Sequence, residues 1–510
     1  MNSAVWLLER AANKFPDKIA IEDIKYSITY REYRDLSRKI AKNLLTSKYD
    51  DCPVVIFLGK NYKTLTSFMG ARYSSRPYVP IDINMPVYRL QKIIDSLKPC
   101  VFITDKDLLE SLKDLSFDNV DVKIYEELLS VEEDKELIDK TISEIKKEDN
   151  AYIIYTSGST GIPKGAIRPD KGIKEWVDFV DKKYHFNSDI TIASITPFYY
   201  EMSNLDVYYS IYAGAKLLIV PDVLLMHAYQ LLEYIKEKEV NSMFSVPSVL
   251  INIANSGALN NIELPHLTNV MFSGEIMPNR QLNIWRNKFP DVKFTNIYGT
   301  SETSFICFYD IEREFQDSDS LPTGMCSDYL KMYLFKEDGT LARIGEEGEL
   351  CLAGTTVSNK YWNNPENSKK AFVVNPLNEK EIIYKTGDNA YINEYGELCF
   401  RTRKDFQIKK HGHRIELGEI EHAAMNIDGV INAAAVYEAE KEEIILFIET
   451  DKEFSLHPFN VKLRDYIPSF MLPSHLVPMK KLFYKANGKM DRVKLKLEFD
   501  KRKQEVKNAW

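Results

Sequence analysis

The chain has 510 residues, of which 44% are hydrophobic and 28% are charged, and its formal net charge is -8 at pH 7. This length suits about three domains and excludes a single small structural module. The acidic balance argues against a general binder of nucleic-acid backbones, and no stretch approaches the roughly 18 consecutive apolar residues of a membrane helix. We therefore expect a protein that neither binds nucleic acid nor inserts into a membrane.

The first residues and the cysteines indicate a cytoplasmic protein. Glu9 and Arg10 come directly after the short apolar run of the N-terminus, an order unlike that of a secretory signal. The six cysteines are scattered without a CxxC pair, so the sequence suggests neither a disulfide framework nor a zinc site. We expect reduced and mostly buried thiols.

Alternating helical and strand patterns run through the first 300 residues. Residues 30–45 have the apolar spacing of a helix, and the charge-rich stretch 130–150 suits a solvated helix or connector. Short apolar runs predict buried strands at residues 52–58, 100–104, 151–156, 215–220 and 269–272. This alternation predicts an α/β fold with largely parallel, helix-flanked sheets.

The pattern changes past residue 320. Short strands with turn signals predict a compact β subdomain at about 320–402, and helix and strand patterns then return in a small α+β domain over residues 406–510. Polar loops, among them residues 155–161, 246–249, 273–275 and 297–302, follow predicted strands. Ligands of open α/β sheets gather at such carboxyl ends, so we expect a binding site there.

The loop after the strand at 151–156 suits an anion. Its glycines permit tight turns, its hydroxyl groups and bare amides can donate hydrogen bonds, and Lys164 adds positive charge. It is not a Walker A loop, because Pro163 stands where that motif needs its second glycine. Taken alone, it also suits a flexible connector. The residues that we expect to bind this anion are Thr156, Ser157, Gly158, Ser159, Thr160, Gly161 and Lys164.

Five motifs extend this interpretation over nearly the whole chain. They are YTSGSTGIPKG (155–165), NIYGTSE (296–302), YKTGD (384–388), RKDFQIKKHGHRIELGEIE (403–421) and NGKMDR (487–492). In this order they resemble the adenylate-forming enzymes, which include acyl-CoA synthetases, luciferases and the adenylation domains of nonribosomal peptide synthesis. Within that superfamily, the chain looks most similar to the D-alanine:D-alanyl carrier protein ligases.

The resemblance implies a domain organisation. An N-terminal adenylation core would span residues 1–402, a hinge at 403–405 would turn about Asp405, and a mobile lid domain would span 406–510. Turning the lid would withdraw Lys489 and bring in the loop around Gly412, which opens a tunnel for a thiol-bearing arm.

The resemblance also implies a reaction. A substrate carboxylate attacks the α-phosphorus of ATP to form an acyl adenylate and pyrophosphate, and a thiol then captures the acyl group. Lys489 would stabilise the charge on the α-phosphate and the incoming carboxylate, and Glu302 would hold Mg²⁺ between phosphate oxygens.

Other motif positions would bind the nucleotide. Tyr298 and Asn296 look like the residues that contact adenine, whereas Asp388 resembles the aspartate that accepts both ribose hydroxyls, assisted by Arg403. The same stretch would line the nucleotide with Ile297, Gly299, Thr300 and Ser301.

The predicted substrate pocket departs from the family pattern. Glu201 stands where amino-acid-activating members place an aspartate that pairs with the substrate ammonium, so an amine-bearing substrate is expected. The extra methylene moves the charge by about 1.5 Å, which suits glycine or β-alanine as well as D-alanine. Ser273 replaces a cysteine usual in D-alanine ligases, and Phe305 replaces a smaller aliphatic residue. Five tyrosines either crowd this pocket or pack in the core, which is favoured: Tyr199, Tyr200, Tyr208, Tyr209 and Tyr212.

Three functions remain open at this level. The first is a ligase that adenylates a small amino acid and loads the phosphopantetheine arm of a separate carrier protein, since no carrier domain is expected after residue 500. The second is an acid:CoA ligase or an aryl-acid-activating enzyme, against which Glu201 argues. The third, a non-catalytic nucleotide-binding homologue, is disfavoured by the joint presence of Lys164, Glu302, Asp388 and Lys489.

Overall fold

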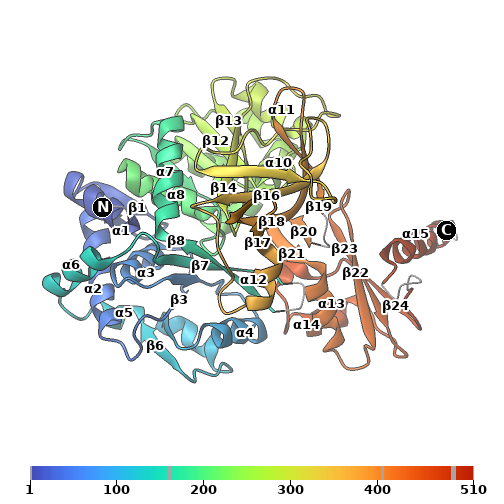
Figure 1. The fold of residues 1–510 in the computed structure, drawn as a ribbon, viewed down its shortest axis with the longest axis horizontal. Coiled ribbons are helices and arrows are strands. Elements are labelled where there is room, and N and C mark those ends of the chain that lie inside the picture. The colour runs from blue at the N-terminus through green and yellow to red at the C-terminus, as the bar shows by residue number, and fades with distance from the viewer. Residues whose placement is uncertain (1–2, 159–161, 404–406, 484–489, 509–510) are drawn as a thin grey trace. The chain divides into compact units, whose positions relative to one another are not determined.

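The computed structural model describes residues 3–158, 162–403, 407–483 and 490–508, and the chain divides into two compact units (Figure 1). The first unit comprises Met1–Ile83, Ser96–Tyr155 and Gly165–Lys404, and the second comprises Asn84–Asp95, Thr156–Lys164 and Asp405–Trp510. The break after Lys404 falls within the predicted hinge, although Asp405 itself lies outside the described residues. The glycine-rich loop belongs to the second unit.

An eight-stranded sheet forms the largest layer of the first unit. Its central pairings are parallel, and only the pairings of the two edge strands are antiparallel. Its strands are, in spatial order, β14 (Ser304–Asp310), β13 (Lys293–Thr300), β12 (Asn269–Ser273), β11 (Ser242–Ser245), β9 (Thr191–Ser194), β10 (Lys216–Ile219), β1 (Ile19–Glu22) and β2 (Ser27–Thr29). Parallel strands buried on both faces need the continuous apolar runs that the sequence contains.

A six-stranded sheet and a five-stranded sheet complete this unit. The six strands, whose registered pairings are all parallel, are β6 (Val120–Ile124), β5 (Cys100–Thr104), β3 (Val54–Phe57), β4 (Tyr78–Pro80), β7 (Asn150–Thr156) and β8 (Lys164–Pro169). The five antiparallel strands are β15 (Leu330–Phe335), β16 (Gly348–Gly354), β17 (Phe372–Asn375), β18 (Asn378–Ile392) and β19 (Leu398–Arg403). This last sheet occupies the region predicted as a β subdomain.

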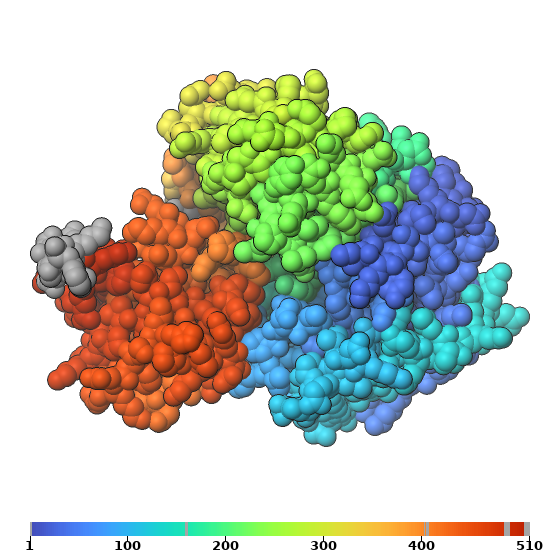
Figure 2. All heavy atoms as spheres, turned by 180° about the vertical axis from the view of Figure 1, so that it is seen from behind, coloured from blue at the N-terminus to red at the C-terminus, as the bar shows by residue number. Residues whose placement is uncertain are grey.

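Helices cover these sheets. The first unit contains α1 (Ala4–Lys14), α2 (Tyr30–Leu45), α3 (Tyr62–Tyr73), η1 (Lys106–Leu112), α5 (Tyr125–Leu128), α6 (Lys135–Glu144), α7 (Asp170–Tyr184), α8 (Ser203–Ala213), η2 (Asp222–Met226), α9 (Ala228–Glu237), α10 (Pro247–Ser256), η3 (Ala258–Asn261), α11 (Asn279–Lys288) and α12 (Pro365–Ala371). In Figure 2, the blue N-terminal segment lies against the green middle of the same unit, and Tyr30 donates hydrogen bonds to the carbonyls of Ser210 and Ala215 there.

The second unit has its own core. It combines β20 (Gln407–Lys410), β21 (His413–Glu416), β22 (Asn432–Glu438), β23 (Glu443–Glu449) and β24 (His475–Met479) with α13 (Leu417–Met425), α14 (Leu456–Leu463), η4 (Ser469–Met471), α15 (Arg492–Asn508) and most of α4 (Val87–Leu97). Buried apolar residues of α13, α14, β22 and β23 form one cluster. The predicted fold class, α/β with largely parallel sheets and a small C-terminal domain, is confirmed.

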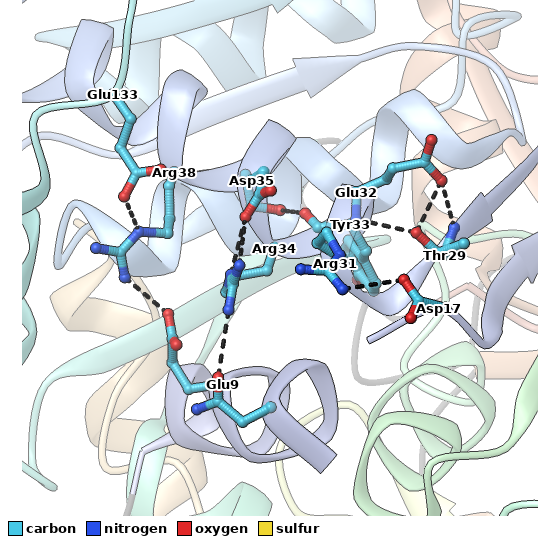
Figure 3. Close-up of polar contacts among 12 residues, drawn as sticks. Glu9, Asp17, Thr29, Arg31, Glu32, Tyr33, Arg34, Asp35, Arg38 and Glu133 are labelled. Carbon is cyan, nitrogen blue, oxygen red and sulfur yellow. Dashed lines mark hydrogen bonds and ion pairs between the residues drawn. The ribbon is translucent and has the colours of Figure 1, made fainter. Parts of the chain in front are cut away.

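The helix at residues 30–45 shows how local sequence sets an element. Thr29 caps α2 by accepting a hydrogen bond from the backbone of Glu32, whose side chain accepts one from Thr29 in return. Farther along α2, the guanidinium of Arg38 is 2.8 Å from Glu9 on α1 and 2.6 Å from Asp139 on α6; Figure 3 shows the contact with Glu9. A buried cation thus joins three helices.

The sequence suggests neither a disulfide framework nor a membrane-spanning helix. All six cysteines are free thiols, and five of them are buried. Among the residues that the structure describes, no helix combines the length and the apolar character needed to cross a membrane.

Candidate active site

The candidate substrate residues lie at the carboxyl ends of two parallel strands of the eight-stranded sheet, β9 and β12, which are separated by β11. Glu201 lies in the loop between β9 and α8, and Ser273 ends β12. The two loops approach closely, since a Cβ added to Gly274 would lie 3.4 Å from the sulfur of Met202, and Gly274 has a φ of +101°. Parallel strands end at one edge of a sheet, and this brings the residues together.

Glu201 is buried, with 7% of its surface exposed. Its Oε1 atom accepts hydrogen bonds from the hydroxyls of Tyr152, at 2.7 Å, and of Ser304. The Nη2 atom of Arg168 lies 3.6 Å from the same oxygen. The other carboxylate oxygen, Oε2, is buried without a hydrogen-bond partner in the described part of the chain.

Burial dominates the electrostatics of this carboxyl group. Loss of hydration raises the pKa of Glu201, while Arg168 and the hydrogen bonds from Ser304 and Tyr152 oppose that rise, and the charge of Glu302 adds to it. The contacts of Oε1 therefore replace only part of the hydration that the carboxylate loses on burial. A cation that donates a hydrogen bond to Oε2 would supply the rest.

A tight turn between β13 and β14 directs Ser304 to this site. Ser304 has a φ of +63°, and a Cβ on Gly299 would lie 2.3 Å from the carbonyl oxygen of Ser304. Only glycine fits at position 299, because any side chain would push the returning strand away. The pairing register shifts at this point, between Tyr298 and Gly299.

The candidate nucleotide residues form a second polar group in the first unit. The hydroxyl of Tyr298 donates to Asp388, which also pairs with Arg403. Arg403 donates to the carbonyl of Thr386 at 3.2 Å, and the amide of Asn296 donates to the carbonyl of Pro322 at 2.8 Å. Four predicted residues from β13, β18 and β19 are thus held by ordered polar contacts. Both Tyr298 and Asp388 are buried.

Glu302 is fully buried and accepts a hydrogen bond from the hydroxyl of Tyr361 at 2.8 Å. No cluster of three or more histidines, cysteines, aspartates or glutamates suited to a metal exists among the described residues. A single carboxylate fits a magnesium ion that is held mainly by phosphate oxygens, rather than an ion bound in an all-protein cage.

Two described residues of the glycine-rich segment, Ser157 and Lys164, contact other residues of the second unit. The hydroxyl of Ser157 donates to the carbonyl of Arg414 at 2.8 Å, and Nζ of Lys164 lies 3.4 Å from Glu416. A Cβ on Gly158 would lie 2.0 Å from the carbonyl oxygen of Ile162, so this position requires glycine. The hydroxyl of Thr156 is buried without a hydrogen-bond partner in the described residues.

The remaining predicted residues lie in the second unit or outside the residues that the structure describes. Gly412, with a φ of +78°, is in the turn between β20 and β21 of the second unit. The following predicted residues lie outside the described residues: Ser159, Thr160, Gly161, Asp405 and Lys489.

Comparison with known proteins identifies the family. The sequence model of the family of AMP-binding enzymes matches residues 8–362 of this chain. The chain belongs to this family. Membership confirms the resemblance found in the sequence and makes the protein an ATP-dependent, AMP-forming ligase.

Individual relatives of this AMP-binding enzyme cover nearly its whole length. A D-alanine--D-alanyl carrier protein ligase of Bacillus cytotoxicus is 28% identical over 96% of this chain and 98% of its own. An adenylation domain of Vibrio cholerae in complex with glycyl-adenosine-5'-phosphate is similar in structure, with a TM-score of 0.82, 19% identity and 98% coverage of both chains. An o-succinylbenzoate CoA synthetase of Bacillus subtilis also gives a TM-score of 0.82, with 19% identity over 96% of this chain and 98% of its own.

Some side chains of this enzyme face away from the expected ligands. Ile297 packs in the core of the first unit, so only its backbone is available to a nucleotide. Phe305 packs edge-on against Trp176 and Phe244, and its neighbour Ser304 makes the contact with Glu201 instead. Of the five tyrosines, Tyr208 and Tyr209 are buried in the same core.

Sequence reasoning missed three residues around Glu201: Tyr152, Arg168 and Ser304. Arg168 left one weak signal, because a charged residue follows the short apolar run Ala166–Ile167 within the strand β8. Tyr152 and Ser304 gave none, since a tyrosine in a buried strand and a serine in a turn are ordinary.

Proposed function

We propose that this enzyme adenylates a small amino acid of the D-alanine, glycine or β-alanine type and transfers it to the phosphopantetheine thiol of a separate carrier protein. The main support for an amine-bearing substrate is the buried carboxylate of Glu201, whose Oε2 atom has no hydrogen-bond partner in the described residues. An ammonium group would donate a hydrogen bond to this oxygen and place a positive charge beside it. An amine-free acid would leave the oxygen desolvated and unpaired.

In the first half-reaction, an oxygen of the amino-acid carboxylate forms a bond with the α-phosphorus of ATP. The bond from that phosphorus to the bridging oxygen of the β-phosphate breaks, and pyrophosphate leaves. Glu201 would hold the ammonium end of the substrate, which fixes the carboxylate at the other end within reach of the phosphorus. Lys489 would stabilise the charge that develops there, as the motif around it implies.

The nucleotide would lie along the polar group of β13 and β18. Asp388 would accept the ribose hydroxyls, helped by Arg403, and the ring of Tyr298 would stack on adenine beside the amide of Asn296. Magnesium, when bound through Glu302, would neutralise phosphate charge. The contacts among Tyr298, Asp388 and Arg403 support this assignment, because a carboxylate held by two donors is already positioned for a ligand.

The second half-reaction needs a thiol. The thiol sulfur attacks the acyl carbonyl, the bond between that carbon and the phosphate oxygen breaks, and AMP leaves. We propose a rotation about Asp405 that exchanges Lys489 for the loop around Gly412. During adenylation, Lys164 would release Glu416 and contact phosphate instead, since a phosphate oxygen replaces the carboxylate as the charged acceptor of the lysine.

The test is ATP–pyrophosphate exchange with purified enzyme against D-alanine, L-alanine, glycine, β-alanine, larger amino acids and aryl acids. We expect exchange with a small amine-bearing acid. Exchange with amine-free acids alone would contradict the role of Glu201 and favour the acid:CoA or aryl-acid alternative. Loading of a carrier protein, compared with thioester formation on coenzyme A, then identifies the acceptor, which the fold leaves open because both kinds of ligase share it.

A further inference from the structure

Arg168 is a buried cation that lies close to Glu201, the expected partner of the substrate amine. None of the five sequence motifs includes Arg168. It lies on β8, the strand after the glycine-rich loop, and none of its surface is exposed. Its Nη2 atom donates to the carbonyl of Ser301 at 2.8 Å, and its Nη1 atom donates to the carbonyls of Glu302, at 3.4 Å, and Thr356. A buried guanidinium held by backbone carbonyls has a fixed position, but carbonyl oxygens leave its charge without an anion.

Glu201 provides that anion. Nη2 of Arg168 is 3.6 Å from Oε1 of Glu201, which is too long for a hydrogen bond but close enough for strong attraction in a dry site. Among the described residues, the hydroxyls of Tyr152 and Ser304 also donate hydrogen bonds to Glu201, and the carboxylate of Glu302 repels it. Arg168 is therefore the cation that favours the ionised form of Glu201 against the effect of burial.

Arg168 also fixes a distance. The same guanidinium contacts Glu201 at the amine end and the backbone of Ser301 and Glu302 at the nucleotide end. Because the guanidinium is planar and rigid, the spacing between the two ends cannot change freely. A substrate with its amine on Glu201 then presents its carboxylate at one set distance.

We propose that Arg168 is a positioning residue that determines specificity: it maintains the charge of Glu201 and the spacing to the nucleotide turn, and so makes the pocket select a small zwitterionic amino acid over the matching amine-free acid. This inference rests on the proposed function. Without Arg168, the buried carboxyl group loses the cation that favours its ionised form, and its attraction for an ammonium falls.

The experiment measures kcat and KM of pyrophosphate exchange for the preferred amino acid and for its amine-free analogue, for example glycine and acetate. The variants are Arg168→Gln, Arg168→Lys, Glu201→Gln and the double variant Arg168→Gln with Glu201→Gln. We expect Arg168→Gln to reduce the ratio of kcat/KM for the amino acid to that for the analogue about tenfold or more, chiefly through KM. Arg168→Lys keeps the charge and should keep the ratio within about threefold, with a lower kcat because the fork is lost.

The double variant tests the coupling. In the Glu201→Gln background, Arg168→Gln should change the ratio little, because there is no longer an anion to maintain. Arg72→Gln is the matched control, since Arg72 is equally buried, donates to the carbonyls of Arg76 and Asn150, and pairs with Asp170 at 2.8 Å. It should lower thermal stability without changing the ratio.

Two results would overturn the inference. One is an equal loss for both substrates in Arg168→Gln, and the other is a ratio as poor in Arg168→Lys as in Glu201→Gln; the second comparison stands even where Arg168→Gln does not fold. In either case, a loss of amine preference in Glu201→Gln would leave the proposed function intact. If the unmodified enzyme showed no preference for amines, the proposed function itself would fail.

Discussion

Two buried acids lie close together in the sequence but in different surroundings. Glu201, before α8, faces two hydroxyl donors and the guanidinium of Arg168. Asp206, inside α8, is 1% exposed, and neither of its carboxylate oxygens has a hydrogen-bond partner in the described residues. Burial raises the pKa of both acids; Arg168 and two hydroxyl donors oppose the rise at Glu201, whereas at Asp206 the charge of Lys60 opposes it without a hydrogen bond to the carboxylate. The contrast separates an acid prepared for a ligand from an acid that is merely buried.

The largest effect is expected from Glu201→Gln. The amide keeps an acceptor for Tyr152 and Ser304 but loses the charge for the ammonium, so exchange with the preferred amino acid should fall about 100-fold or more. Asp206→Asn makes the same chemical change and should leave exchange within about threefold. Steady-state exchange at saturating ATP measures both variants, with thermal melts to confirm folding. Equal losses in the two variants would show that Glu201 contributes no more to exchange than any other buried acid.

The second-largest effect is expected from acidification, which should weaken binding of the amino acid. The pKa of Glu201 is raised, so the group takes up a proton as pH falls through that value, and the ammonium then loses its partner. Below that point, KM for the amino acid should rise about tenfold per pH unit, while KM for the amine-free analogue should not follow it. Asp206→Asn should keep this profile. A profile shared by the two substrates would assign the titration to another group.

Asp206→Asn should stabilise the fold. The pKa of Asp206 is raised well above its usual value, so the folded state keeps a proton that the unfolded state releases as pH rises above about 4. That difference destabilises the native protein increasingly with pH up to the folded pKa, and an amide avoids it. We expect a gain of about 1–3 kcal/mol near pH 7 and almost none near pH 4. Denaturant unfolding at the two pH values measures it, and a gain at pH 4 as large as at pH 7 would contradict this explanation.

The sequence predicted the elements well where the pattern is local. The run at residues 100–104 is β5, and the helical spacing at 30–45 is α2 with its capping box. Both depend on neighbours in the sequence, namely apolar continuity and a Thr29–Glu32 pair, which a single sequence contains in full.

The environment of Glu201 could not be predicted in the same way. Tyr152, Arg168 and Ser304 come from β7, β8 and the start of β14, and their meeting depends on how two sheets pack. The position of Ser304 further depends on a positive φ, which a serine gives no reason to expect. The motif implied that an acid would be there, but which groups hold one oxygen and leave the other unpartnered is a tertiary property.

The smallest predicted effect concerns the oxygen that is already engaged. Tyr152→Phe keeps the ring, which stacks on Tyr78 with centroids 5.3 Å apart, and removes only the hydroxyl that donates to Oε1 of Glu201. Losing one hydrogen bond to a charged acceptor should cost about 1–2 kcal/mol of amino-acid binding, measured as a rise in KM of roughly tenfold with kcat little changed.

Tyr78→Phe is the control for this change, because it removes a hydroxyl that is as buried but contacts Asn204 and Tyr208 instead of Glu201. It should affect stability and leave KM for the amino acid nearly unchanged. If both variants raised KM equally, the tyrosine hydroxyls would serve only to pack the pocket wall. A rise confined to Tyr152→Phe means that fixing Oε1 is what keeps Oε2 in position for the substrate amine, as the contrast with Asp206 requires.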